Sequence, residues 1–383
     1  MMPFSASDQS TIGVEWELAL IDPVSRELTS RASDVLEALQ SNYPQLLTPS
    51  KDRAHITGEF LANTVELVTG VCRTPAEAAD QLRQAASCLK EVTDELGLAF
   101  FSAGTHPFSS ALEQPVVDKD RYLRVLDRSQ FWGRRQIIYG VHVHTGVSSR
   151  AKALPVLNGL TNFYPHLLAL SASSPFWEGE DTGFASHRSQ LFQQLPTSGL
   201  PFTFESWEAY EAYLGDLLAT GVIDDPSENR WDVRPVPAYG TVEMRAYDGL
   251  ASINDVAALT AFTQCLVEWF SRQLEAGKCI EPLQPWHQQE NKWRAARYGT
   301  EAIVILNNRN EEKLVTEDVL GLLNRLEPIA YDLGSADELA QVEHICREGA
   351  GYQRQRKVAE DAGGGQVGLL AVVDDLVAQA QSF

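Results

Sequence analysis

Acidic, imidazole and guanidinium side chains occur in pairs, two residues apart, in three short segments. The pairs are Glu15 and Glu17, His142 and His144, and Glu243 and Arg245. Side chains two residues apart on a β-strand point to the same face of a sheet. Carboxylate oxygens and imidazole nitrogens are common ligands of divalent cations. The spacing therefore predicts a sheet with one face that holds metal ions.

Three segments share the β-branched and aromatic residues and the alternating polarity that are typical of strands: 11–21, 137–145 and 241–247. A fourth segment, 57–69, adds Glu59 and Glu66. These two residues are seven positions apart, so on one regular strand they would face opposite ways. If both serve one site, we expect a bulge or turn near Ala62 and Asn63.

Each pair also has a simpler interpretation. A Glu-x-Glu strand is common on a solvated outer face, and Glu243 with Arg245 fits a same-face ion pair. The His-x-His pair is more specific, because two imidazoles beside Val141 and Val143 have few other reasons to lie together. Taken one at a time, the acidic pairs leave both interpretations open.

Composition limits the classes of function. The chain has 383 residues, of which 44% are hydrophobic, so it can bury a large core, and we expect one catalytic unit over 1–383. The formal net charge of −21 argues against a nucleic-acid partner, because binding to phosphates needs a basic surface. The sequence leaves the oligomeric state open, including a homo-oligomer.

The cysteines and the N-terminus indicate the compartment. Five cysteines are scattered along the chain without a C-x-x-C pair, which favours a reducing environment over a disulfide framework. The N-terminus has no basic and apolar leader, and no run of about 18 apolar residues predicts a membrane span. We therefore expect a cytoplasmic protein without a membrane partner.

Helix signals are frequent and do not alternate strictly with strands. Thr74-Pro-Ala-Glu77 is a capping box that predicts a helix ending at Gly97, and Ser335-Ala-Asp-Glu338 is a second box. Gly221, Gly277 and Gly299 are expected to end helices. Further helices are predicted at about 119–129, 151–172, 206–220, 253–275, 287–298, 316–327 and 367–380. The mixture predicts an α+β fold with a mostly antiparallel sheet.

Common nucleotide-binding and hydrolase motifs are missing. Residues 363–368 match G-x-G-x-x-G, but no strand precedes them and the chain ends too soon for an acidic residue that binds ribose. The sequence has no P-loop, no H-E-x-x-H and no G-x-S-x-G. Any nucleotide must therefore bind to another kind of site.

Together, the motifs resemble one family. They are Ile12-Gly-Val-Glu-Trp-Glu-Leu18, Glu59 to Glu66, Tyr139-Gly-Val-His-Val-His-Thr-Gly146, Ser173-Ser-Pro-Phe-Trp177, Trp231-Asp-Val-Arg-Pro235, Gly240-Thr-Val-Glu-Met-Arg245 and Asn291-Lys-Trp-Arg-Ala-Ala-Arg-Tyr-Gly299. In this order, over about 10–360, they resemble the bacterial carboxylate-amine ligases of the glutamate-cysteine ligase type 2 family. That family is similar to glutamine synthetase in its catalytic core. The resemblance implies a curved antiparallel sheet that forms a funnel-shaped active site, flanked by helices.

The resemblance also implies roles for individual residues. Arg245 resembles the cation that stabilises the transferring phosphoryl group, and Glu66 is expected to be catalytic as well as a ligand. Arg188, in the Gly- and Ser-containing loop 178–200, is a candidate for binding a substrate carboxylate. His144, Asn291, Arg294 and Arg297 are candidates for the nucleotide or amino-acid pocket. The residues that resemble the metal ligands are Glu15, Glu17, Glu59, Glu66, His142 and Glu243.

The implied activity is an ATP-dependent ligation of glutamate to cysteine, with Mg²⁺ or Mn²⁺. Such ligases move the γ-phosphoryl group of ATP onto a carboxylate, and an amine then attacks the acyl phosphate. Two anions must approach each other, so a site of this kind neutralises charge. A ligase for another small amine, a related metal-dependent phosphotransferase, a metal hydrolase and a catalytically weak binding protein stay open as alternatives.

Overall fold

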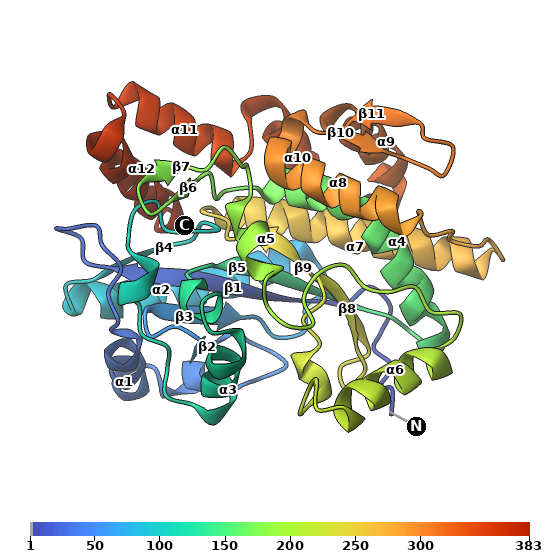
Figure 1. The fold of residues 1–383 in the computed structure, drawn as a ribbon, viewed down its shortest axis with the longest axis horizontal. Coiled ribbons are helices and arrows are strands. Elements are labelled where there is room, and N and C mark those ends of the chain that lie inside the picture. The colour runs from blue at the N-terminus through green and yellow to red at the C-terminus, as the bar shows by residue number, and fades with distance from the viewer. Residues whose placement is uncertain (1–2) are drawn as a thin grey trace.

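The computed structural model describes residues 3–383, so Met1 and Met2 of the expected unit lie outside the described residues. Within residues 3–383, seven strands form one sheet in the order β2-β3-β1-β5-β9-β8, with β4 beside β1. Each pairing in this sheet is antiparallel. Helices surround this sheet (Figure 1), which confirms the α+β prediction. The strands are β1 (Ile12–Ile21), β2 (His55–Gly58), β3 (Thr64–Val68), β4 (Ala99–Phe101), β5 (Gly140–Gly146), β8 (Val233–Val236) and β9 (Thr241–Asp248). Smaller pairs are β6 (Phe176–Trp177) with β7 (Glu180–Asp181), and β10 (Ile303–Ile305) with β11 (Glu312–Leu314).

The helices agree closely with the predicted positions. Thr74 caps its helix by accepting a hydrogen bond from the Glu77 N–H, and Gly221, Gly277 and Gly299 follow helix ends with positive φ. The helices are α1 (Ala32–Asn42), α2 (Pro75–Glu95), α3 (Asp120–Ser129), α4 (Arg150–Ser171), α5 (His187–Phe192), α6 (Trp207–Ala219), α7 (Ile253–Glu275), α8 (Pro285–Tyr298), α9 (Val315–Leu333), α10 (Ala336–Glu348), α11 (Gly351–Asp361) and α12 (Gly365–Ala380).

Three helices differ from the expectation. Helices α1 and α11 were not predicted, and Arg188 lies in α5 and not in the predicted loop. The Ser186 side chain caps α5 by accepting a hydrogen bond from the Ser189 N–H, and this short helix has too few residues for a visible periodicity. The second predicted capping box was wrong, because the Ser335 side chain makes no cap and its hydroxyl lies 3.6 Å from Cys265 Sγ.

One face of the sheet is apolar and packs against helices. Val14, Trp16 and Leu18 of β1 are at most 1% exposed. They belong to one hydrophobic core with residues of α2, α4 and α7, three of the helices that contact the strands. The Trp16 indole N–H donates to the Leu250 carbonyl at 2.9 Å, and so fixes β1 to the segment after β9. Because side chains alternate, the opposite face receives Glu15 and Glu17.

A bulge in β9 adjusts this alternation. Val141 pairs with Tyr247, but Val143 pairs with Met244, so β9 has one extra residue between the two pairs. Met244 and Tyr247 are fully buried, and the Tyr247 hydroxyl bonds Thr263 of α7 at 2.5 Å. The bulge thus allows two residues three positions apart to face the helices.

A turn joins β2 and β3 at Ala62 and Asn63, as the spacing of the two acidic residues predicted. Glu59 lies in this connection and Glu66 lies within β3, so both can approach the same face of the sheet. Tyr139 Oη donates to Asn63 Oδ1 at 3.0 Å, which fixes the turn against the residue that precedes β5.

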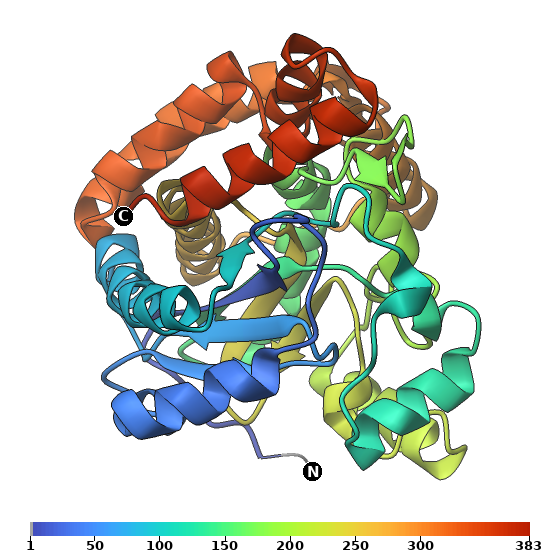
Figure 2. The same ribbon diagram turned by 90° about the vertical axis from the view of Figure 1, so that its left-hand side faces the viewer.

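The C-terminal helices form an arch over the sheet (Figure 2). Gly299, at the end of α8, packs against Tyr352 of α11. A glycine is required there, because a Cβ would lie 2.4 Å from the Tyr352 ring and the φ of this residue is +55°. In the described residues no helix is long and apolar enough to cross a bilayer.

Lys292 and Asp232 form an ion pair in the interior. Lys292 Nζ lies 2.6 Å from Asp232 Oδ2, and both side chains are 4% exposed. The pair fixes α8 to the segment that leads into β8, and the Asp232 carbonyl accepts the backbone N–H of Arg245 in β9 at 2.8 Å. The pair therefore supports the edge of the sheet that carries Arg245.

We expect Lys292→Met to lower the free energy of unfolding by about 3–5 kcal/mol, because it leaves the Asp232 carboxylate buried without a cation. Urea unfolding followed by circular dichroism measures the loss. Lys313→Met is the matched control: Lys313 is 38% exposed and lies 3.5 Å from Asp318, so its change should cost less than about 1 kcal/mol. Equal losses in the two variants would contradict the importance of the buried pair.

Candidate active site

The register of the strands brings the predicted side chains together on the polar face of the sheet. Four cross-strand pairs connect β3, β1, β5, β9 and β8 in that order across the sheet. The pairs are Glu17 with Glu66, Glu15 with His142, His144 with Glu243, and Glu243 with Arg234. Segments more than 200 residues apart in the sequence thus contribute to one cluster.

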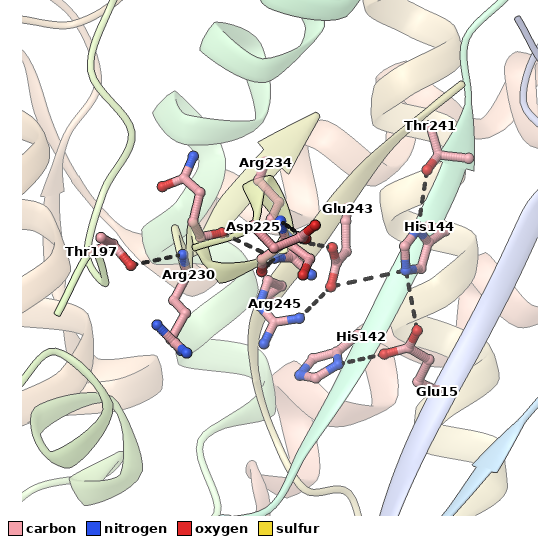
Figure 3. Close-up of polar contacts among 12 residues, drawn as sticks. Glu15, His142, His144, Thr197, Asp225, Arg230, Arg234, Thr241, Glu243 and Arg245 are labelled. Carbon is pink, nitrogen blue, oxygen red and sulfur yellow. Dashed lines mark hydrogen bonds and ion pairs between the residues drawn. The ribbon is translucent and has the colours of Figure 1, made fainter. Parts of the chain in front are cut away.

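Two groups of donor atoms share Glu15. Glu15, Glu66 and His142 form one group, and Glu15, His144 and Glu243 form the other, with the atoms of each group within 4.8 Å of one another. His142 Nδ1 lies 2.7 Å from Glu15 Oε2, and His144 Nε2 lies 3.3 Å from Glu15 Oε1. Figure 3 shows Glu15 bridging the two imidazoles. One carboxylate therefore joins both groups.

Glu243 is the most strongly compensated carboxylate. It is fully buried, and its oxygens accept from Arg234 Nε at 2.6 Å and from the Arg245 guanidinium (Figure 3). Burial opposes its negative charge, but the positive charges of Arg234, Arg245 and His144 hold the pKa of Glu243 far below its usual range. Glu243 is therefore ionised at neutral pH.

The opposite end of the cluster has excess negative charge. Burial raises the pKa of Glu17 to about 7, although the nearby Arg188 guanidinium acts in the other direction. Burial also raises the pKa of Glu66, and the charges of Glu15, Glu59 and Glu17 raise it further. These carboxylates lack sufficient positive charge around them.

The residues at this end fit divalent cations such as Mg²⁺ or Mn²⁺. Glu66 is only 8% exposed, yet no hydrogen bond or ion pair to its carboxylate occurs among the described residues. Hard cations prefer carboxylate oxygens, with an imidazole tolerated by Mn²⁺. A cation beside Glu66 would supply the missing positive charge, so the donor set and its electrostatics agree.

Arg188 crosses the polar face beside Glu17. Its side chain is buried, and a Cβ on Gly140 would lie 2.2 Å from its terminal nitrogen, so only glycine leaves room for the guanidinium. The Nε atoms of Arg188 and Arg245 are buried without a hydrogen-bond partner among the described residues. Both guanidinium groups lie near the Phe192 ring. They are placed to bind anions that approach the carboxylates.

Two predicted residues of α8 have structural partners instead. The Asn291 side-chain amide donates to the Ile305 carbonyl and accepts the Ile305 N–H, both at 2.8 Å, so it supports β10. Arg294 binds Glu290 at 2.8 Å and Glu312 at 2.6 Å. These contacts occupy the polar atoms of both side chains, and the expectation that they line the pocket stays a prediction.

Arg297, the third predicted residue of α8, has a different environment. Its guanidinium donates to the Gly183 carbonyl and stacks near the Phe184 and Tyr298 rings. None of these contacts involves the carboxylate cluster. Arg297 therefore supports the loop before α5, and α5 is the helix that contains Arg188.

Three further residues lie at the site that no motif in the sequence indicated. Arg234 contacts Glu243, and at the other end Tyr122 Oη lies 3.4 Å from Glu59 Oε2 with Arg121 beside it. The alternating polarity of β8 is a sequence signal for Arg234, because it places this residue opposite Glu243 on the neighbouring strand β9. Arg121 and Tyr122 begin α3, and no local pattern indicates that this helix lies against the site.

The raised pKa of Glu17 predicts how the stability of the metal-free protein depends on pH. The folded state binds a proton at Glu17 more tightly than the unfolded state, whose pKa is near the ordinary 4.5. The stability that Glu17 contributes is therefore fully present below pH 4.5 and is lost as pH rises through 7. We expect a loss on the order of 1–3 kcal/mol from Glu17 between pH 5 and 7.5.

Urea unfolding in EDTA at pH 5, 6 and 7.5 measures this dependence. The glutamine side chain in Glu17→Gln cannot titrate. The free energy of unfolding of this variant should therefore fall less between pH 5 and 7.5 than that of the unmodified chain, and the difference should equal the loss expected from Glu17. Parallel curves for the two proteins would show that the Glu17 pKa is not raised by burial.

Comparisons with known proteins identify the family of this chain. Residues 11–371 match the glutamate-cysteine ligase family 2 (GCS2). The chain is 56% identical over 379 residues to a protein of Arthrobacter sp. (strain FB24) provisionally named glutamate–cysteine ligase 2-1, covering 99% of this chain and 98% of that one. It is 49% identical over 378 residues to a protein of Mycobacterium avium (strain 104) provisionally named glutamate–cysteine ligase 2, covering 99% and 96%.

Among solved structures, glutamate–cysteine ligase from Francisella tularensis in complex with AMP has the same fold. It aligns with a TM-score of 0.67 over 97% of this chain and 89% of that one, at 13% sequence identity. The carboxylates and histidines of the sheet lie in segments that the family match covers. The chain belongs to the glutamate-cysteine ligase family 2.

Proposed function

We propose that this protein is an ATP-dependent carboxylate–amine ligase that joins the γ-carboxylate of glutamate to the amine of cysteine. The observation that carries the proposal is the arrangement on one buried sheet face, where under-compensated carboxylates lie beside Arg188 and Arg245, each with a free Nε. Phosphoryl transfer to a carboxylate brings anions together, and this face offers both cation ligands and guanidinium groups. Membership of the family supports the same activity.

The proposed ligands for Mg²⁺ or Mn²⁺ are Glu15, Glu17, Glu59, Glu66, His142 and Glu243. When bound, such cations supply positive charge that neutralises the phosphates of ATP. The sheet keeps these ligands in place: His142 hydrogen bonds Glu15, and the backbone N–H of Gly140 donates to Glu17. Tyr122 contacts Glu59 from α3.

Arg245 and Arg188 have separate proposed roles. Arg245 is held by Glu243 and by the bulge in β9, and it would stabilise the negative charge of the transferring phosphoryl group. Arg188, buried beside Glu17, would bind a carboxylate of glutamate. His144 donates or accepts at Thr241 through Nδ1 at 3.0 Å, so its Nε2 is directed toward Glu15 and Glu243 and would contact phosphate or orient those ligands.

The proposed reaction has two steps. A glutamate γ-carboxylate oxygen attacks the γ-phosphorus of ATP, and ADP leaves as the γ-glutamyl phosphate forms. The amine nitrogen then attacks the carbonyl carbon, a C–N bond forms, the C–O bond to phosphate breaks, and the amine loses a proton. Burial of the site would limit hydrolysis of the acyl phosphate by water.

We propose that the whole chain acts as one catalytic unit in the cytoplasm. A single hydrophobic core with side chains from β1 to α12 supports one unit. All five cysteines are free, which is consistent with a reducing compartment.

The decisive experiment measures ADP release from the full chain with Mg²⁺, ATP and glutamate, with and without each candidate amine. We expect ADP and γ-glutamylcysteine, detected by mass, only when cysteine is present, and no ADP in excess EDTA. ADP with another amine would correct the acceptor. ADP with a phosphorylated acceptor and no amide would favour a phosphotransferase, and no ADP in any combination would refute the ligase.

Substitution of Arg245 tests the proposed mechanism. We expect Arg245→Ala to lower kcat by at least about 100-fold, because one donor to the developing charge is removed. Arg309→Gln is the control, since Arg309 is exposed and pairs only with Glu311 at 3.1 Å. Both variants should keep the circular dichroism spectrum of the unmodified chain, and unchanged kcat in Arg245→Ala would exclude this residue from the mechanism.

A further inference from the structure

A further carboxylate lies on the polar face of the sheet, at the end of β9. Asp248 is fully buried, and its partner across the sheet is Gly140 of β5. Gly140, His142 and His144 alternate along β5, so they share the polar face. Residues opposite each other on paired strands point to one face, which places Asp248 on the same side. Arg188 of α5 crosses this face over Gly140, and Figure 1 shows α5 next to β9.

Three hydrogen-bond donors converge on the Asp248 carboxylate. Its Oδ2 accepts from the Ser173 N–H at 2.9 Å and from the Ser174 hydroxyl at 2.6 Å. Its Oδ1 accepts from the Ser186 hydroxyl at 2.8 Å. An ionised carboxylate can accept at both oxygens, whereas an amide can accept only at one of its two polar atoms. The site therefore requires a carboxylate and not merely a polar side chain of this shape.

Two of these donors also hold the first turn of α5. Ser174 Oγ accepts the Arg188 N–H at 3.0 Å, and Ser186 Oγ accepts the Ser189 N–H at 3.3 Å. A hydroxyl that donates its proton to a carboxylate keeps its lone pairs for these N–H groups. The first N–H groups of a helix have no partner within the helix, so fixed acceptors determine where it begins. Asp248 thus sets the position of the Arg188 backbone through two hydroxyl groups.

The Arg188 side chain has little freedom to compensate for a shift of its backbone. It is 4% exposed, and a Cβ on Gly140 would lie 2.2 Å from its terminal nitrogen. Burial raises the pKa of Asp248, and the charge of Arg188 opposes this rise, as it does at Glu17. The guanidinium therefore interacts with an acidic group of β1 as well as with Asp248 of β9, and its placement depends on where α5 starts.

We propose that Asp248 is a positioning residue for Arg188, which it holds in place for a substrate carboxylate through the hydroxyl groups of Ser174 and Ser186. The assignment rests on the ligase function proposed above, in which Arg188 binds glutamate. Asp248 would not touch the substrate, and its effect is on the affinity for glutamate. The assignment also gives a role to the motif Ser173-Ser-Pro-Phe-Trp177, because its two serines supply two of the three donors.

The test measures kcat and the KM values for glutamate and ATP in the full chain, with cysteine and Mg²⁺ saturating. The variants are Asp248→Asn, Ser186→Ala, Arg188→Gln and the double variant Asp248→Asn/Arg188→Gln. Ser206→Ala is the matched control, because Ser206 caps α6 by accepting the Ala209 N–H at 3.2 Å. Thermal unfolding of each variant checks that it is folded.

We expect Asp248→Asn to raise KM for glutamate by about 10- to 100-fold and to change KM for ATP less than about threefold, because a displaced guanidinium weakens one substrate contact. Ser186→Ala should act in the same direction. Asp248→Asn should add little to Arg188→Gln, since both remove the same contact. Ser206→Ala should leave both KM values unchanged. Equal rises in the two KM values, additive effects in the double variant, or an unchanged KM for glutamate would overturn the assignment.

Hydrogen exchange separates this proposal from the ligase proposal. The exchange of the backbone amides in a peptide covering 186–192 is measured by mass spectrometry, and we expect it to be faster in Asp248→Asn than in the unmodified chain and in Ser206→Ala. If no combination of substrates yields ADP, the ligase function fails, but faster exchange in α5 would still sustain the positioning of Arg188. Unchanged exchange would refute it. If Asp248→Asn does not fold, Ser186→Ala decides by the same measurements.

Discussion

The burial of negative charge on one sheet face is the constraint on which the rest of the structure depends. An ionised carboxylate costs several kcal/mol to bury unless a cation or hydrogen-bond donors compensate it. Glu243 meets this condition through Arg234, Arg245 and His144, and its pKa falls accordingly. Glu17 and Glu66 do not meet it, and their pKa values rise. The cluster thus has one end that the protein compensates itself and one end that fits bound cations.

The apolar face of the same sheet makes this arrangement rigid. Side chains that alternate with the charged ones are buried against α2, α4 and α7, so a shift of register would expose the core as well as move the site. The bulge in β9 lets Met244 and Tyr247 both face the helices while Glu243 and Arg245 remain on the polar face. Groups placed on paired strands in this way need little reorganisation when charge moves during a reaction.

Loops and short helices supply the groups that the sheet lacks. Arg188 comes from α5 and crosses the sheet over Gly140, and Tyr122 comes from α3.

The sequence by itself determined the elements whose signals are local. The period of two placed Glu15 with Glu17 and His142 with His144 on a common face, the seven-residue separation of Glu59 and Glu66 predicted the turn between β2 and β3, and glycines marked helix ends. The order of the motifs also identified the family. These features depend on neighbouring residues, so a single sequence contains them.

Only the tertiary structure decided which charged groups face the site. Helical spacing made Asn291 and Arg294 neighbours, but the strands β10 and β11 pack on that side of α8 and occupy both residues, while Lys292 between them pairs with Asp232. Arg188 reaches the site because α5, which is distant in sequence from β5 and β9, packs against them there. Such contacts depend on the three-dimensional packing of whole elements, and the local pattern of residues does not record which element will lie opposite.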